Sequence, residues 1–144
     1  SDDIKSINEL LNKSIEIIQN VEFIKEKTVL THLFDELQKD KVVYGIIDVL
    51  HELFTNNIQE LFIYEDIKLY VNEKILENEI NIIEENIYYN KKKYINKSNE
   101  NNKIDFIDFI EEKYPNLKIN LISNKTEIGY QFVKMSELMG IKFI

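Results

Sequence analysis

The sequence predicts an α/β protein: a layered α/β/α sandwich around a mixed central sheet with a parallel βαβ crossover, plus a small strand-rich insertion. Three observations predict this fold. Helical apolar periodicity alternates along the chain with apolar runs of strand length. Residues 42–64 show strand, glycine turn, helix and strand without a gap, and residues 68–103 change to a different, alternating pattern. At 144 residues and 44% hydrophobic content, the chain is long enough for one domain, residues 1–144, with a sizeable core.

Two helical patterns open the chain. The first spans about residues 3–20 and has one apolar face, so we expect that face to pack on another element. The second follows directly and ends near residues 38–40, where a polar run cannot continue its apolar stripe. The first face consists of Ile4, Ile7, Leu11, Ile15 and Ile18. The second stripe consists of Phe23, Leu30, Leu33, Phe34 and Leu37.

A βαβ unit follows the helices. Residues 42–44 predict a short buried strand, and Gly45 supplies the freedom at φ that a strand-to-helix turn uses. The next helix ends at Asn56 and Asn57, because asparagine tolerates a left-handed cap. Residues 61–64 form a continuous apolar run, typical of a strand that is covered on both faces. Strand, helix and strand in this order predict a right-handed parallel crossover.

The insertion at about residues 68–103 has alternating stretches near 69–71 and 80–83, which predict strands. Polar Asn and Lys repeats follow. Such repeats bury too little apolar area to offset the entropy of ordering, so we expect a mobile loop at about 97–102 and high mobility across 91–102.

The main unit then resumes. A helix with apolar positions from Phe106 onward is closed by Pro115, which cannot donate a helical hydrogen bond. Residues 117–122 predict another core strand. Thr126 is expected to cap a further helix, and Gly140 is expected to precede a last strand at 141–144.

Charge and composition exclude several classes of protein. The net charge of −8 argues against a general binder of nucleic-acid backbones and favours partners with basic patches. The chain has no cysteine, no apolar run long enough to span a bilayer, and no signal-peptide pattern at its start. We therefore expect a cytoplasmic protein without membrane association.

Residues that suggest chemistry are few. His32 and His51 have no further ligand-type residues at metal-binding spacing. The acidic helix surface that starts at Asp105 is interpreted as a solvated face, and the three glycines lie too far apart for a phosphate-binding loop. No catalytic residue, metal or cofactor is therefore expected.

One basic and aromatic cluster is a candidate for contact with RNA phosphates and bases, although a solvated hairpin is the simpler interpretation. The cluster consists of Lys91, Lys92, Lys93 and Tyr94, with Tyr88 and Tyr89 beside them.

Several stretches together indicate a family. They are NVEFIKEK at 20–27, LFDELQ at 33–38, VVYGIIDVL at 42–50, LFIYEDI at 61–67, DFIDFIEEKYPNLKINLIS at 105–123 and TEIGYQFVKM at 126–135. With these stretches the chain resembles the C-terminal domain of the eukaryotic class I polypeptide chain release factor, which ends translation at stop codons. The likeness covers nearly the whole chain.

The resemblance implies a protein-binding module without enzymatic activity or cofactor. In the family, this domain docks on the class II release factor GTPase through the region after the first helix and the final strand. The residues implied to bind the partner are Ile24, Leu30, Phe34, Leu37, Gly140, Ile141 and Phe143. Phe34 is the expected anchor, since exposed aromatic residues often dominate the affinity of such surfaces.

The resemblance also implies that the insertion is the family's minidomain, which lies near the ribosomal decoding region and influences stop-codon preference. The residues implied to lie nearest RNA are Tyr70, Lys91, Lys92, Lys93 and Tyr94. We expect a monomer that meets the ribosome as part of the full-length protein and binds RNA weakly or not at all by itself.

Two family motifs are absent. The Gly-Gly-Gln tripeptide, which triggers peptidyl-tRNA hydrolysis, and the codon-reading Asn-Ile-Lys-Ser motif do not occur in the sequence. Two other interpretations stay open. The C-terminal domain of the related ribosome-rescue factor has the same architecture but no comparable minidomain. A small RNA-binding protein of the ribosomal L30-like kind has a similar sandwich, but the net charge of −8 counts against it.

Overall fold

A four-stranded sheet organises the chain in the computed structural model, which describes residues 2–72, 80–83, 86–89, 92–96 and 103–144. The strand order is β1-β9-β2-β8. β2 and β8 are parallel neighbours, whereas β9 is antiparallel to both β1 and β2. The predicted mixed sheet is therefore confirmed. The four strands are β1 (Val42–Tyr44), β2 (Ile58–Tyr64), β8 (Lys118–Ile122) and β9 (Leu138–Lys142).

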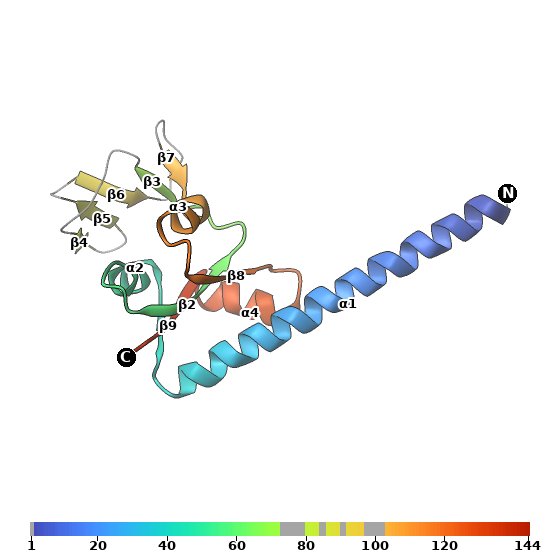
Figure 1. The fold of residues 1–144 in the computed structure, drawn as a ribbon, viewed down its shortest axis with the longest axis horizontal. Helices are drawn as coiled ribbons and strands as arrows, with labels where there is room; N and C mark the ends of the chain where they lie inside the picture. Colours follow the sequence, from blue (N-terminus) through green and yellow to red (C-terminus); the bar gives the residue numbers. More distant parts are fainter. Residues whose placement is uncertain (1, 73–79, 84–85, 90–91, 97–102) are drawn as a thin grey trace.

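Helices cover both faces of this sheet, as the predicted α/β/α sandwich requires (Figure 1). The helices are α1 (Asp2–Gln38), α2 (Ile46–Phe54), α3 (Phe106–Lys113) and α4 (Glu127–Met135). α1 and α4 share one apolar cluster with the sheet, centred on Phe62 and Phe132. α2 and α3 share the other, centred on Leu61 and Phe106. Apolar residues on alternate sides of β2 thus hold the two helical layers in place.

The structure differs from the predicted parallel βαβ crossover in one respect. β1 and β2 are parallel to each other, because both are antiparallel to β9, but they are not neighbours, since β9 lies between them. The last strand also begins at Leu138 and not at Ile141, so Gly140 lies inside it. All four residues from Leu138 to Ile141 are buried, and an unbroken apolar strand of this kind belongs at the centre of a sheet covered on both faces.

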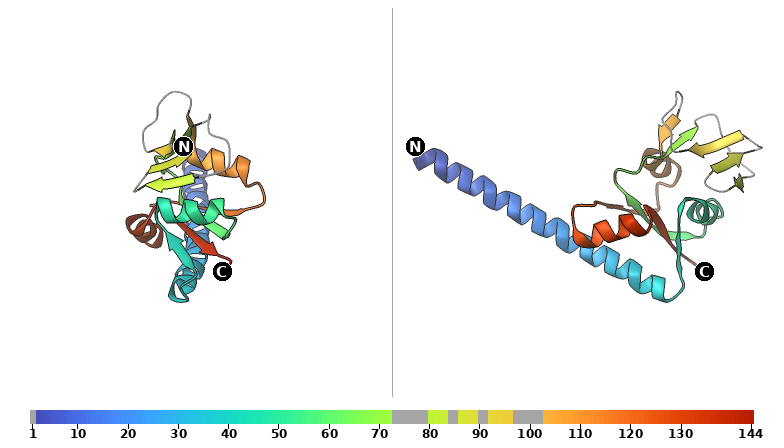
Figure 2. Two further views of the ribbon diagram at one scale, coloured as in Figure 1. Left: turned by 90° about the vertical axis from the view of Figure 1, so that its left-hand side faces the viewer. Right: turned by 180° about the vertical axis from the view of Figure 1, so that it is seen from behind.

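The two helical patterns at the start of the chain form one continuous helix, α1, so the prediction of two separate helices was wrong. The sequence has neither glycine nor proline between residues 20 and 23, and nothing there breaks the hydrogen-bond ladder. The apolar residues move to a different side of the helix after residue 20, while the helical backbone continues without a break. Every side chain from Asp3 to Lys25 is exposed, and Figure 2 shows this half of α1 projecting away from the sheet. The expected packing of the first apolar face is therefore not seen within the described chain.

The insertion forms a second sheet of five strands in the order β4-β5-β6-β3-β7, and every neighbouring pair is antiparallel. The predicted strand-rich character is confirmed. The strands are β3 (Tyr70–Asn72), β4 (Ile80–Ile83), β5 (Asn86–Tyr89), β6 (Lys92–Asn96) and β7 (Lys103–Asp105). The loop predicted at 97–102 lies outside the described residues.

The predicted turn residues occupy the conformations expected of them. Gly45 has a φ of 90° and precedes α2, and its N–H donates to the carbonyl of Leu138 at 3.1 Å. Asn56 has a φ of 60° directly after the α2 cap. Thr126 caps α4, because its Oγ1 accepts a hydrogen bond from the N–H of Gly129. Local chemistry therefore defines the helix ends.

We expect Gly45→Ala to lower the free energy of unfolding by about 1–3 kcal/mol through backbone strain, because a φ of 90° with a ψ of 152° is a conformation essentially restricted to glycine. A Cβ atom at this position would meet no atom within 4 Å, so a steric clash contributes nothing. Urea denaturation measures the effect, with Asn56→Gly as the matched control, which relieves a positive φ and should preserve stability. A Gly45→Ala variant as stable as the parent would show that the turn tolerates a side chain.

Candidate partner-binding surface

Two of the residues implied to bind a partner are core residues. Leu30 has no exposed surface and Ile141 is only 3% exposed, and both pack in the cluster that α1 and α4 share with the sheet. Their side chains cannot form a surface contact, so both assignments are corrected. Leu30 is buried because it shares with Leu33 the face of α1 that packs on the sheet. Ile141 is buried because it lies in the central strand β9.

Gly140 likewise has a packing role. It is buried within β9, and a Cβ atom there would lie 2.7 Å from Cδ1 of Ile58. The absence of a side chain lets Ile58 pack against the strand. Gly140 therefore offers no side chain to a partner.

The remaining implied residues are accessible to different degrees. Ile24 is 61% exposed and Phe143 is 60% exposed. Phe34 and Leu37 are half-buried at the border of the cluster on the α1 side. These four residues are the accessible part of the predicted surface.

The end of α1 and the end of β9 meet at one end of the sheet. The N–H of Lys142 donates to the carbonyl of Lys41 at 2.8 Å, and Val42 of β1 pairs with Ile141 of β9. Leu37 and Phe143 thus belong to chain segments that are distant in sequence and adjacent in space. We call this region, residues 34–41 with 142–144, the sheet-end surface.

Phe143 borders an open groove on the α2–α3 side of the sheet end. The groove has a volume of about 390 Å³, and Leu53, Ile58, Tyr114 and Leu117 are among its lining residues. The side chain of Asn57 fixes the chain end, since its Oδ1 accepts from the N–H of Ile144 at 3.2 Å and its Nδ2 donates to the carbonyl of the same residue at 3.2 Å. Phe143 is therefore an exposed aromatic residue on an anchored segment.

Lys113 and Tyr114 also line this groove. Nζ of Lys113 lies 5.4 Å, 5.6 Å and 6.0 Å from the ring centres of Phe54, Phe109 and Tyr114, within the range of cation–π attraction. Burial raises the pKa of the Tyr114 hydroxyl to about 12, so this group stays protonated at neutral pH. The groove thus offers aromatic, apolar and cationic contacts to a partner.

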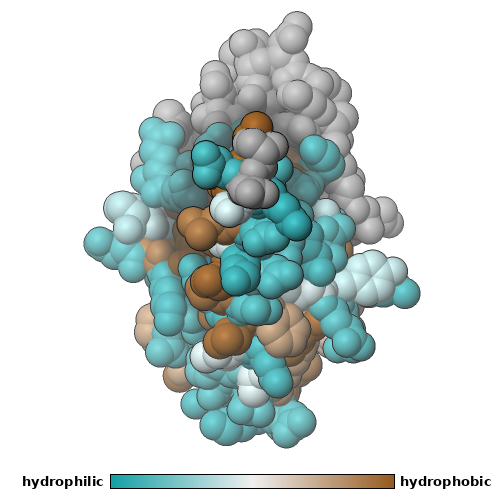
Figure 3. Space-filling model, turned by 90° about the vertical axis from the view of Figure 1, so that its right-hand side faces the viewer, coloured by the Kyte–Doolittle hydropathy of each residue, from teal (hydrophilic) through white to brown (hydrophobic). Residues whose placement is uncertain are grey.

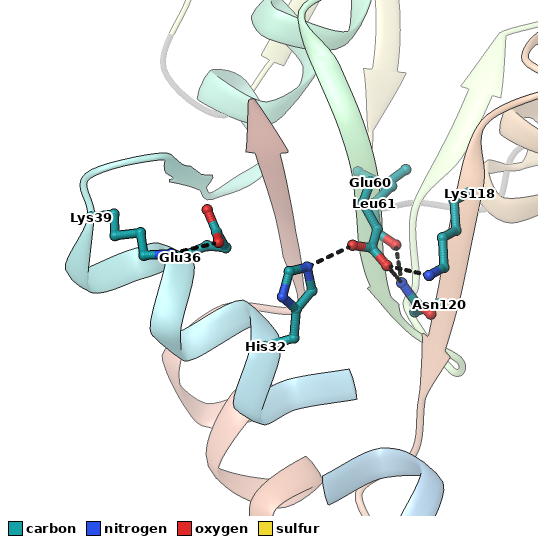
Figure 4. A network of polar contacts seen from close by, with 7 residues as sticks. All are labelled: His32, Glu36, Lys39, Glu60, Leu61, Lys118 and Asn120. Atoms are coloured by element: carbon teal, nitrogen blue, oxygen red, sulfur yellow. Dashed lines mark hydrogen bonds and ion pairs between the residues drawn. The ribbon is translucent and has the colours of Figure 1, made fainter. Parts of the chain in front are cut away.

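A buried carboxylate connects α1 to the sheet. Glu60 of β2 is 7% exposed, and Figure 4 shows three side chains converging on it. Nε2 of His32 lies 3.3 Å from its Oε2, while Nζ of Lys118 at 3.1 Å and Nδ2 of Asn120 at 3.0 Å contact its Oε1. These donors satisfy a carboxylate that would be costly to bury alone.

A second carboxylate joins α1 to α4. Oε1 of Glu26 accepts a hydrogen bond of 2.7 Å from the N–H of Ser123, and its Oε2 accepts one from the hydroxyl of Thr126. A Cβ at Gly129 would lie 2.2 Å from the carbonyl oxygen of Ser123, so only glycine fits beside this joint. Neither Glu26 nor Glu60 was recognised from the sequence. The only sequence signal for these two contacts is the position of the carboxylates: Glu26 interrupts the apolar pattern of its helix, and Glu60 borders the apolar run of its strand.

The residues implied to lie near RNA belong to the second sheet. Tyr70 is in β3, where it pairs with Asn96 of β6 and Asp105 of β7. Lys92, Lys93 and Tyr94 lie in β6, which pairs with β5, whereas Lys91 lies outside the described residues. The strand register places Lys92 opposite Tyr89 and Lys93 opposite Tyr88. The predicted basic and aromatic cluster is therefore carried by two paired strands.

Comparison with solved structures identifies the fold. The C-terminal domain of a peptide chain release factor from Methanosarcina mazei superposes with a TM-score of 0.60 at 19% sequence identity. The similarity covers 96% of this chain and 94% of that domain. The chain thus has the architecture of the release-factor C-terminal domains. Among the described residues, no helix combines the length and apolar character needed to cross a membrane.

Sequence comparison identifies the family. The family model described as eRF1 domain 3 matches residues 23–143. The eukaryotic peptide chain release factor subunit 1 of Didinium nasutum is 32% identical over 141 residues, and subunit 1-3 of Arabidopsis thaliana is 29% identical over 150 residues. Each alignment covers 88% of this chain but only 32% of the relative, so the chain spans about a third of their length. The chain belongs to the eRF1 domain 3 family, and the resemblance seen in the sequence is confirmed.

We expect Glu26→Ala to lower the free energy of unfolding by about 1.5–3 kcal/mol, the usual value for hydrogen bonds to a charged group. The substitution removes the acceptor for Ser123 and Thr126 and loosens α4 from α1. Glu22→Ala, one turn earlier on the exposed part of the same helix, is the matched control and should change stability by no more than about 0.5 kcal/mol. Equal urea midpoints for the two variants would contradict a joint at Glu26.

Proposed function

We propose that the chain acts in translation termination as a non-catalytic module that docks on the class II release factor GTPase. The observation that carries this proposal is the sheet-end surface. It brings together the region after the exposed half of α1 and the final strand, the two segments through which the family is expected to bind. Membership of the eRF1 domain 3 family supports the setting, cytoplasmic protein synthesis on the ribosome.

Docking would use the accessible residues of the predicted set. Phe34 and Leu37 lie on the α1 side of the sheet end, and Phe143 lies over the α2–α3 groove. An apolar surface with aromatic anchors and a polar border is typical of protein-binding sites. The GTPase would therefore contact both sides of the sheet end, with Ile24 at the border of the contact.

The second sheet would have a separate role. We propose that it is the minidomain of the full-length factor, with Tyr70 and the basic strand β6 directed to the ribosomal decoding region, where it would influence stop-codon preference. The antiparallel strand content of this sheet supports the proposal. The net charge of −8 argues against independent RNA binding by the chain alone.

We predict that Phe34→Ala weakens binding to the class II release factor GTPase at least tenfold, equivalent to about 1.4 kcal/mol. Because Phe34 is half-buried, its stability loss should stay below the about 3–5 kcal/mol of a fully buried phenylalanine. Titration calorimetry and thermal unfolding on the same protein separate the two effects. Tyr130→Ala on α4, another half-exposed aromatic residue, is the control and should bind normally. Unchanged affinity of Phe34→Ala would exclude Phe34 from the interface.

We also predict that the chain releases no peptide from stop-programmed ribosomes loaded with peptidyl-tRNA. Its three glycines are separated in sequence, so it contains no Gly-Gly-Gln tripeptide. The assay compares the chain with ribosomes alone and with a release factor that carries the tripeptide. Release above the rate of ribosomes alone would show that the module is catalytic.

A further inference from the structure

β8 is an edge strand, and its outer side is free. It follows β2 at the end of the order β1-β9-β2-β8, and no strand in the part of the chain that the structure describes pairs with its other side. An edge strand presents unpaired backbone N–H and C=O groups that can bind another extended chain, so many proteins shorten or bulge such strands. β1, the opposite edge, has only three residues, whereas β8 has five and pairs with β2 without a bulge. We call the outer side of β8 the free edge.

The pairing with β2 shows which backbone groups point to the free edge. The carbonyl of Ile122 accepts a hydrogen bond from the N–H of Glu65, directly after β2, so the backbone of Ile122 faces β2. Successive residues of a strand direct their N–H and C=O groups to opposite sides, because the chain turns over at each residue. Ile119 and Leu121 therefore direct theirs to the free edge, while Asn120 bonds to β2.

The N–H of Ser123 agrees with this alternation and marks the end of the free edge. Ser123 follows Leu121 in the same alternation, and its N–H donates to Oε1 of Glu26 on α1 at 2.7 Å. A side-chain acceptor thus takes the place that the backbone of another strand would occupy. The free edge therefore offers two N–H and two C=O groups, those of Ile119 and Leu121, and an added extended chain can bond to all of them.

α1 forms one wall of a groove along the free edge. The groove has a volume of about 390 Å³, and five consecutive residues, 119–123, line it. Consecutive residues of a strand place their side chains on opposite faces, so a lining that includes all of them follows the edge of the strand and not one face of the sheet. The helical wall lies on one side of α1, at steps of three and four residues. It consists of Glu22, Lys25, Glu26 and Val29.

The side chains around the groove indicate what a bound strand should carry. Leu121 is 48% exposed although it is apolar, and Val29 and Ile119 are half-buried, so apolar side chains of an added strand would gain burial on both of its faces. The exposed charged residues that line the groove are two of each sign and favour no strongly charged ligand. They are Glu22, Lys25, Glu65 and Lys125. Figure 3, viewed from the side toward which α1 projects, shows apolar side chains between hydrophilic ones at the surface.

We propose that the free edge of β8 and the α1 wall bind an extended peptide segment of a partner protein, which adds to the sheet as a further strand. The segment pairs antiparallel to β8, since antiparallel pairing is the more stable per residue. It is about five residues long, or roughly 17 Å, and it carries apolar side chains beside Leu121 and toward Val29. The site shares no residue with the sheet-end surface, so it is independent of GTPase docking.

Selection from a phage-displayed library of random peptides tests the binding. The parent chain should enrich uncharged, apolar peptides. Leu121→Pro should weaken their binding about tenfold or more, because proline removes a donor at the free edge while the bonds to β2 remain. Leu121→Ala is the matched control, since it shortens the same side chain but keeps the N–H, and it should retain most of the affinity. Enrichment of no peptide, or equal binding by the parent and Leu121→Pro, would overturn the proposal.

Amide hydrogen exchange followed by NMR locates the bound peptide on the parent chain. Without peptide, the amides of Ile119 and Leu121 should exchange faster than those of Asn120 and Ile122, which donate to β2. A synthetic copy of an enriched peptide should slow exchange at Ile119 and Leu121. Protection confined to another part of the chain would reject the free edge as the site, and protection that rises with chain concentration alone would assign it to a second copy.

Methylation of the peptide backbone provides a test that needs no variant of the chain. A methyl group on a peptide nitrogen that donates to β8 should abolish binding, whereas methylation of the next nitrogen, which points away from β8, should leave the affinity nearly unchanged. A peptide that tolerates methylation at every position would bind through its side chains alone, and strand addition would be refuted.

Discussion

The position of β9 between β1 and β2 is the constraint on which the other features depend. Residues Leu138 to Ile141 are all buried. Leu138 packs in the cluster under α2 and α3, and Met139 and Ile141 pack in the cluster under α1 and α4. The strand also holds Gly45 at the entry to α2 through the carbonyl of Leu138. Because the last strand completes the sheet, the earlier elements cannot reach their final packing until the end of the chain is in place. This long-range pairing is typical of α/β domains with a high sequence separation between contacts.

α1 is a single helix with two different environments. Its second half buries Leu30 and Leu33 against the sheet, while its first half has no buried side chain among the described residues. Glu26 and His32 mark the transition. Glu26 contacts Ser123, directly after β8, and Thr126 at the start of α4, whereas His32 contacts Glu60 of β2. An isolated amphipathic helix gains little stability by itself in water, so the packing of Leu30 and Leu33 on the sheet contributes most of the stability of α1. The second half of α1 is therefore a structural layer of the sandwich, while the side chains from Asp3 to Lys25 are exposed.

Two apolar clusters, one on each face of the four-stranded sheet, hold the helices of the sandwich in place. The half-buried carboxylate of Glu26 links α1 to the start of α4, and the buried carboxylate of Glu60 links β2 to α1 and β8. The polar residues at the core are explained by packing and hydrogen bonding, because each buried donor or acceptor among the described side chains has a partner.

The sequence by itself determined the α/β class, the family and most local features. Gly45, Asn56, Pro115 and Thr126 act within one turn of the chain, so their effects follow from neighbouring residues. The sequence did not reveal that β9 separates β1 from β2, that α1 is continuous, or that Leu30 and Ile141 are buried while Ile24 and Phe143 are exposed. The strand order and the burial of Leu30 and Ile141 were decided only by the tertiary structure, because they depend on contacts between distant segments. The continuity of α1, by contrast, follows from the absence of a helix breaker between residues 20 and 23. Glu26 and Ser123, 97 residues apart in the sequence, are one example of a contact between distant segments. Apolar burial contributes most of the free energy that folds the sheet, and the resulting packing decides which polar groups become partners.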